Sequence, residues 1–269
     1  MLDNDSGNRL GFISQKIVRH RGESQRADSD YVAEECPVAL VFNDISHAVM
    51  MATPKDLREF AVGFSLTEGI VQKPSEIFEL EVMEGCAGIE VRMTISQKSF
   101  FELKAKRRAL AGRTGCGVCG IESLELLDLC PGKIAAYPEK VMPSASVIER
   151  ASHSLPGFQS LMHVTGGVHA AAWCSAEGEI IKVFEDVGRH NGLDKLIGFL
   201  ALQGVEMRNG FVFMSSRASY ELVRKVARMN IPMLATISAP TSLAIEIARM
   251  AGVSLVSFCR KDGFVEYVV

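Results

Sequence analysis

The spacing of hydrophobic and polar positions changes several times along the first half of the chain. Residues 1–28 are mostly polar, so we expect a loose N-terminal segment. From Tyr31 the pattern is typical of strands, and after Thr53-Pro54 apolar residues recur at helical spacing, with Thr53 as the expected N-cap. Strands are predicted at ECPVALVFND (35–44), SHAVMMAT (46–53), IFELEVM (77–83) and IEVRMTIS (89–96), and helices at FFELKAKRRALAGR (100–113), ending at Gly112, and at IESLELLDL (121–129).

The second half alternates strands and helices more regularly. Apolar stripes at a spacing of about 3.6 residues run through 193–200 and 244–251, and SASVIERASHSL (144–155) predicts a further helix. Strands are predicted within HVTGGVHAAAW (163–173) and at IIKVFED (180–186), GFVFMSS (210–216), PMLATIS (232–238), VSLVSFC (253–259) and FVEYVV (264–269). This alternation indicates an α/β layer structure with a largely parallel sheet.

A proline-rich stretch separates the two halves with these different patterns. CPGKIAAYPEKVMPS (130–144) contains three prolines and is the predicted domain boundary. We therefore expect a loose segment at 1–28, a smaller α+β domain at 29–143 and an α/β domain at 144–269.

Composition and charge exclude some function classes. The net charge of -3 argues against a nucleic-acid partner, which usually requires a basic face. No run reaches the ~18 apolar residues of a membrane helix, and the acidic, polar start MLDNDSGNRLGF lacks the order of a signal peptide. The seven cysteines are odd in number, as expected for reduced thiols in the cytoplasm rather than a disulfide framework.

Two of the cysteines, Cys116 and Cys119, form a C-x-x-C pair within GRTGCGVCG. A structural zinc needs four ligands, and the chain offers neither a second such pair nor closely spaced histidines. A zinc deaminase needs H-x-E, whereas His169 is followed at the third position by Ala171. We therefore expect no metal site.

Two further chemistries fit a C-x-x-C pair. In a dithiol oxidoreductase the motif follows a strand, whereas here it follows a basic helix and lies among glycines that favour mobility. In sulfur transfer, Arg113 and the basic run at 104–108 would favour a thiolate on Cys116, and a mobile loop would carry the sulfur. The residues alone leave both open.

Predicted strands in the second half end in turns that lead into helices. These turns hold Gly188-Arg189-His190, Ser215-Ser216-Arg217 and Pro240-Thr241-Ser242. Helix N-termini with added arginine and histidine bind anions, and the carboxyl ends of parallel strands meet at one crevice. Capping explains any single serine, but not the polar cluster at 185–191. Because no Walker or G-x-G-x-x-G loop occurs, NTP hydrolysis and nicotinamide chemistry are disfavoured.

Several motifs together resemble those of one family over residues 31–268. They are EECPVALVFN, TPKDLREFAVGFSLTEGI, GRTGCGVCG, GGVHAAAW, EDVGRHNGLDKLIG, SSRASYELV and ISAPTSLAIEIA. The chain is similar to the FdhD family, the formate dehydrogenase accessory sulfurtransferases or sulfur carrier proteins. The resemblance implies that a cysteine desulfurase loads a persulfide onto Cys116, with Cys119 as its partner. The sulfur would then pass to the bis-molybdopterin guanine dinucleotide cofactor before that cofactor enters formate dehydrogenase.

The resemblance also implies a fold and a binding site. The C-terminal domain would be cytidine-deaminase-like without the zinc chemistry, in agreement with Ala171. GDP would be an analogue of the cofactor. The expected cofactor-binding residues are His169, Gly188, Arg189, His190, Ser215, Ser216, Arg217, Phe258, Cys259, Arg260, Lys261, Asp262 and Gly263. A competing hypothesis is a chaperone that holds the cofactor without moving sulfur. A homodimer is left open.

Overall fold

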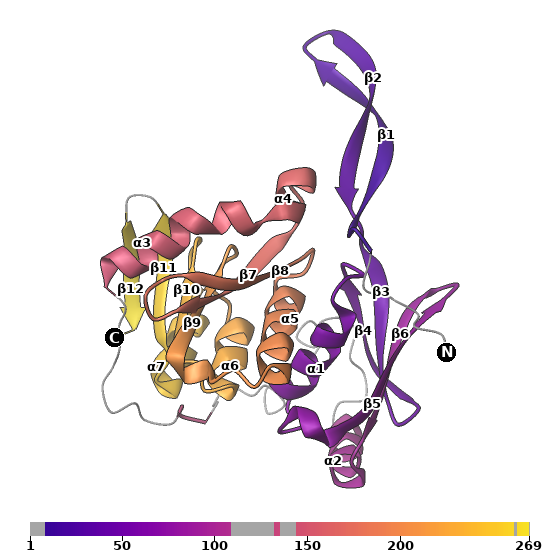
Figure 1. The fold of residues 1–269 in the computed structure, drawn as a ribbon, viewed down its shortest axis with the longest axis vertical. Coiled ribbons are helices and arrows are strands. Elements are labelled where there is room, and N and C mark those ends of the chain that lie inside the picture. Colours follow the sequence, from indigo (N-terminus) through magenta and orange to yellow (C-terminus); the bar gives the residue numbers. More distant parts are fainter. Residues whose placement is uncertain (1–8, 109–131, 135–143, 261–262, 269) are drawn as a thin grey trace.

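Three sheets organise the residues that the computed structural model describes, which are 9–108, 132–134, 144–260 and 263–268. A two-stranded ribbon leads into a four-stranded sheet, and a six-stranded sheet follows (Figure 1). Cys116, Cys119, Lys261 and Asp262 lie outside the described residues, as does the predicted helix at 121–129. The predicted domain boundary also falls largely outside them and stays a prediction.

The ribbon pairs β1 (Phe12–Arg21) with β2 (Ser24–Ala33) in antiparallel register, and it projects from the rest of the molecule (Figure 1). The prediction of a loose segment at 1–28 is therefore wrong from Phe12 onwards. Gly22 adopts a φ of 59° at the turn, and Arg19 forms an ion pair with Asp28 across the strands. Because most side chains on both faces of the ribbon are exposed, its polar sequence is compatible with strand pairing.

The four-stranded sheet has the strand order β4-β3-β6-β5 and is covered on one face by a helix. Asn43 and Asp44 both have positive φ, as a tight turn between β3 and β4 requires. The predicted helix after Thr53 begins later, at Leu57, because Thr53 bonds to the β8 end instead. The elements are β3 (Cys36–Phe42), β4 (Ile45–Ala52), α1 (Leu57–Thr67), η2 (Pro74–Glu76), β5 (Ile77–Gly85), β6 (Gly88–Ile95) and α2 (Gln97–Arg108).

The six-stranded sheet has the order β12-β11-β10-β9-β7-β8. β9, β10 and β11 pair in parallel, whereas β7 pairs antiparallel with β8 and β9, and β12 antiparallel with β11. The prediction of a largely parallel sheet therefore holds only for its centre, because β7–β8 and β11–β12 are hairpins with short turns. The strands are β7 (His169–Ser175), β8 (Ile180–Asp186), β9 (Gly210–Met214), β10 (Met233–Thr236), β11 (Ser254–Arg260) and β12 (Gly263–Val268).

Helices cover both faces of this sheet (Figure 1). The crossover helices α5, α6 and α7 bury their apolar sides against one face, and α3 packs on the other. The helices are α3 (Ala145–Ser154), η4 (Leu155–Phe158), α4 (Ser160–Thr165), α5 (Arg189–Leu202), η5 (Met207–Asn209), α6 (Tyr220–Arg228) and α7 (Ser242–Ala251). In the described ranges, no helix is both long and apolar enough to cross a bilayer.

The two halves meet where α1 crosses α5. Gly63 and Gly198 allow this close approach, since a Cβ at Gly63 would lie 1.8 Å from the Asp194 carbonyl oxygen. At Gly198 a Cβ would lie 1.9 Å from the Glu59 carbonyl oxygen. The middle of α5 therefore packs directly against α1 as well as against its own sheet.

Candidate anion-binding edge of the larger sheet

One edge of the six-stranded sheet collects the turns singled out in the sequence. β8, β9, β10 and β11 run in the same direction, so their carboxyl ends lie at the edge where β7 begins. We call this the carboxyl edge. His169 pairs in register with Asp186, and the next residue, Ala170, exchanges hydrogen bonds with Ser215. The structure therefore brings His169, the 188–190 turn and the 215–217 turn together.

The α5 N-terminus presents positive groups at the carboxyl edge. Gly188 is the N-cap, and no side chain caps the helix. The first N–H groups of a helix carry a partial positive charge and attract anions. The Arg189 Nε is buried and has no hydrogen-bond partner in the described part of the chain. This donor fits an anion such as a phosphate group.

His169 lies close enough to Arg189 for the arginine charge to affect the protonation of the imidazole ring. Burial lowers the pKa of His169, the Arg189 charge and His190 lower it further, and Asp186 opposes them. The neutral ring is therefore favoured in the free protein. A bound anion would partly cancel the Arg189 charge and shift the balance back.

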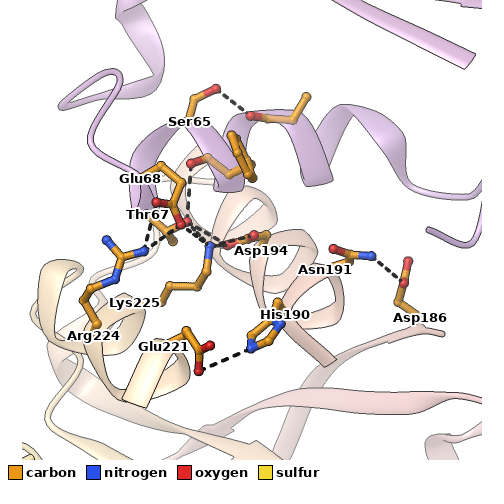
Figure 2. A network of polar contacts seen from close by, with 12 residues as sticks. Ser65, Thr67, Glu68, Asp186, His190, Asn191, Asp194, Glu221, Arg224 and Lys225 are labelled. Atoms are coloured by element: carbon orange, nitrogen blue, oxygen red, sulfur yellow. Dashed lines mark hydrogen bonds and ion pairs between the residues drawn. The ribbon is translucent and has the colours of Figure 1, made fainter. Parts of the chain in front are cut away.

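His190 faces α6 rather than solvent. Its Nε2 atom lies 3.8 Å from a carboxylate oxygen of Glu221, and Figure 2 shows the two side chains pointing toward each other. Burial raises the pKa of Glu221, but the polar side chains of His190 and Ser219 outweigh it and lower the value to about 2. Glu221 is thus ionised at neutral pH and holds the His190 ring between α5 and α6.

In the 215–217 turn, two side chains form hydrogen bonds within the protein and one is exposed to solvent. The Ser215 hydroxyl accepts a hydrogen bond from the Ala170 N–H at 2.8 Å, and buried Ser216 donates to the Arg217 carbonyl oxygen. Arg217 is exposed. Of these three, Arg217 has the charge and the freedom to meet a phosphate. At the α7 start, the Thr241 hydroxyl caps the helix through the Ala244 N–H.

The C-terminal turn joins the same edge beside β10. Phe258 has a φ of 56°, a left-handed conformation that is uncommon for a bulky residue and that recurs at functional sites. Its N–H donates to the Ser238 carbonyl oxygen at 3.4 Å. Arg260 is exposed and its guanidinium lies 6.0 Å from the Phe258 ring centre. Gly263 follows with a φ of 125°.

Comparison with known proteins shows which family this chain belongs to. The model described as the FdhD/NarQ family matches residues 33–268. The chain belongs to this family. The FdhD sulfur carrier protein of Chromobacterium violaceum is 62% identical over 257 residues, covering 96% of this chain and 95% of that protein. The one from Burkholderia mallei is 58% identical over 263 residues, with 96% and 95% covered. The predicted family is therefore confirmed.

A solved structure has the same fold as this FdhD/NarQ chain. It is described as a formate dehydrogenase accessory protein from Desulfotalea psychrophila. It matches with a TM-score of 0.68 at 24% identity, covering 96% of this chain and 97% of that one. The mixed α/β architecture is thus confirmed, and the cytidine-deaminase-like classification stays a prediction.

Three of the four described cysteines of this FdhD/NarQ chain, Cys36, Cys174 and Cys259, are poorly suited to carrying sulfur, whereas Cys86 is exposed. Burial raises the pKa of Cys259 to about 12, so its sulfur stays protonated. Burial also raises the pKa of Cys174 and, together with Glu34, that of Cys36. In the parts that the structure describes, no three potential metal ligands gather. The expected absence of a metal stays a prediction.

Buried charged groups that the sequence did not single out join the two halves of this FdhD/NarQ protein. Lys225 donates to both carboxylate oxygens of Asp194 at 2.9 Å and also contacts Thr67 and Glu68 (Figure 2). Arg224 binds both Glu68 oxygens. Nearer the carboxyl edge, a second cluster surrounds Asp186. No rule of local spacing could have paired these residues, because Thr67 and Lys225 lie 158 positions apart.

Proposed function

We propose that the protein carries sulfur from a cysteine desulfurase to the bis-molybdopterin guanine dinucleotide cofactor, for use by formate dehydrogenase. In this proposal Cys116 holds the sulfur as a persulfide and Cys119 assists. The cofactor is a substrate that binds at the carboxyl edge through its phosphate groups. The family membership supports the carrier role, and the carboxyl edge supports the choice of acceptor.

The observation that carries the binding part is the group of unpaired positive donors at the carboxyl edge. At the α5 N-terminus only the Gly188 N–H is bonded to Asp186, no side chain of the N-cap residue caps the helix, and the buried Arg189 Nε has no acceptor among the described residues. Exposed Arg217 and Arg260 add charge from neighbouring turns. A guanine dinucleotide is polyanionic, and charged hydrogen bonds to its phosphates are worth about 1.5–3 kcal/mol each.

The sulfur-carrying part follows from thiol chemistry. A thiolate on Cys116 attacks the terminal sulfur of the desulfurase persulfide; a new S–S bond forms on Cys116, and the desulfurase cysteine leaves as a thiolate. Arg113 and the basic run at 104–108 favour the thiolate that this step requires. The first cysteine of a C-x-x-C pair before a helix is generally the more acidic, which favours Cys116 over Cys119.

Calorimetry with GDP tests the binding part. Arg189→Ala is expected to weaken GDP binding by about 1.5–3 kcal/mol, because a charged phosphate contact is lost. Arg249→Ala serves as the control, since Arg249 is an exposed arginine in the last turn of α7, away from the carboxyl edge. Unchanged GDP affinity in Arg189→Ala would remove this residue from the site.

A further inference from the structure

A single buried carboxylate lies beneath the 188–190 turn. Asp186 ends β8, and its side chain is fully buried. One oxygen, Oδ1, accepts from the Gly188 N–H at 2.8 Å and from the Asn191 Nδ2 at 3.0 Å. The other, Oδ2, lies 2.6 Å from the Lys195 Nζ. Asp186 therefore bonds to the turn and to the first two turns of α5.

The same carboxylate also binds the N-terminal half of the chain. The Thr53 N–H donates to Asp186 Oδ2 at 3.1 Å, and the Thr53 carbonyl oxygen accepts from Lys195 at 3.0 Å. The Thr53 hydroxyl accepts from the Val187 N–H, and Asn191 donates to the Met51 carbonyl oxygen at 2.8 Å. Residues 51–53 and 186–195 thus form one hydrogen-bonded cluster, which we call the Asp186 cluster.

Geometry makes this cluster specific for one turn conformation. A Cβ at Gly188 would lie 2.6 Å from the Asn191 Nδ2, so a side chain there would displace the Asn191 amide from its hydrogen bonds. With Gly188 before it and Asn191 after it both bonded to Asp186, the Arg189 backbone has little freedom. Donors that are fixed before a ligand arrives bind it more tightly, because the entropy of ordering them is already spent.

We propose that Asp186 is a positioning residue, which holds the Gly188-Arg189-His190 turn in the conformation that binds phosphate. The inference rests on the proposed binding of a guanine dinucleotide at the carboxyl edge. Through Thr53, the cluster also makes the N-terminal half a part of this binding site. Asp186 itself touches no ligand in this account.

The chain offers a matched control on the same helix. Asp194 is also fully buried, pairs with Lys225 at 2.9 Å and ties α5 to the N-terminal half through Thr67. It lies more than a turn further along α5, and its side chain makes no hydrogen bond to the 188–190 turn in the described residues. Removing either ion pair should cost stability, but only one should affect the turn.

The test compares GDP affinity in two double variants at a temperature where circular dichroism shows both to be folded. Each removes both charges of one pair, because a lone buried charge would itself strongly destabilise the chain. Asp186→Ala/Lys195→Met is expected to bind GDP at least about tenfold more weakly than wild type. Asp194→Ala/Lys225→Met is expected to stay within about twofold of wild type.

The possible outcomes separate this inference from the proposed function. Equal GDP affinity in the two double variants and wild type would overturn the role of Asp186. If wild type itself fails to bind GDP, the proposed function is at fault instead. Should the Asp186 double variant not fold, Asn191→Ala takes its place, since it removes the bonds to Asp186 and Met51 without leaving a charge. It is expected to weaken GDP binding about threefold or more, and an unchanged affinity would overturn the inference.

Discussion

At the scale of single residues, the carboxyl edge contains both polar groups that have a partner and polar groups that have none among the described residues. Asp186 pairs with Lys195 at 2.6 Å, and a Glu221 carboxylate oxygen lies 3.8 Å from the His190 Nε2. Arg189 has an unpartnered buried Nε in the described chain. An unmatched donor among matched ones marks where a ligand oxygen would be most favourable.

His169 should report the arrival of that ligand. Its pKa in the free protein is expected below the ordinary value of about 6.5, because of burial and the Arg189 charge. Its contribution to stability is therefore complete above about pH 6.5 and is lost as pH falls toward the lowered folded-state pKa. A diphosphate bound beside Arg189 should raise the pKa of His169.

Histidine NMR titration with and without GDP measures this shift, and His169→Gln assigns the resonance. A His169 pKa that does not change on GDP saturation would place the phosphates elsewhere.

Some of these residues could be recognised from the sequence and others could not. The cluster at 185–191 stood out because charged and small residues follow a predicted strand, which is a local pattern. For its partner Thr53 the sequence predicts a helix cap, a role that the neighbouring residues favour. The burial of Thr53 against Asp186 depends on a contact across 133 positions, which no local rule encodes.

At the scale of elements, the α1–α5 crossing sets where the carboxyl edge stands relative to the N-terminal sheet. Gly63 and Gly198 bring the two helix backbones into direct contact. α5 also carries Lys195 and Asp194, which pair with Asp186 of β8 and Lys225 of α6, so backbone packing and buried ion pairs act on the same helix.

Gly63→Ala is expected to destabilise the protein by about 3 kcal/mol, because the new methyl group would overlap the Asp194 carbonyl. Gly157→Ala is the control, since a Cβ there meets nothing within 4 Å. It should change the free energy of unfolding by less than about 0.5 kcal/mol. Urea unfolding of both variants gives the comparison, and equal stabilities would refute the tight crossing.

Sequence patterns predict some helices and strands correctly and miss others. The strands of both larger sheets and helices α3, α5 and α7 follow from apolar periodicity, because each buries one side in a core. β1 and β2 were missed because the ribbon buries neither face, so no apolar alternation is needed. Strand direction was partly wrong, since periodicity says nothing about whether a neighbour runs parallel.

At the scale of the whole molecule, the two halves should unfold as one unit despite their separate sheets. Buried ion pairs and hydrogen bonds from Lys195 and Lys225 cross between them. The single tryptophan, Trp173, is buried in β7 and reports only on the larger sheet. Its fluorescence and the far-UV circular dichroism signal are expected to change at the same urea concentration. Two separated transitions would show that the halves are energetically independent.

The central claim is that Cys116 holds sulfur in transit, and peptide mapping after loading tests it most directly. The protein is incubated with a cysteine desulfurase and cysteine, digested without reductant and analysed by mass spectrometry. We expect a gain of about 32 Da, one sulfur atom, on Cys116. Cys116→Ala should abolish the gain and the maturation of formate dehydrogenase, whereas Cys119→Ala should still accept sulfur. A persulfide on Cys119 alone, with Cys116→Ala fully active, would contradict the account.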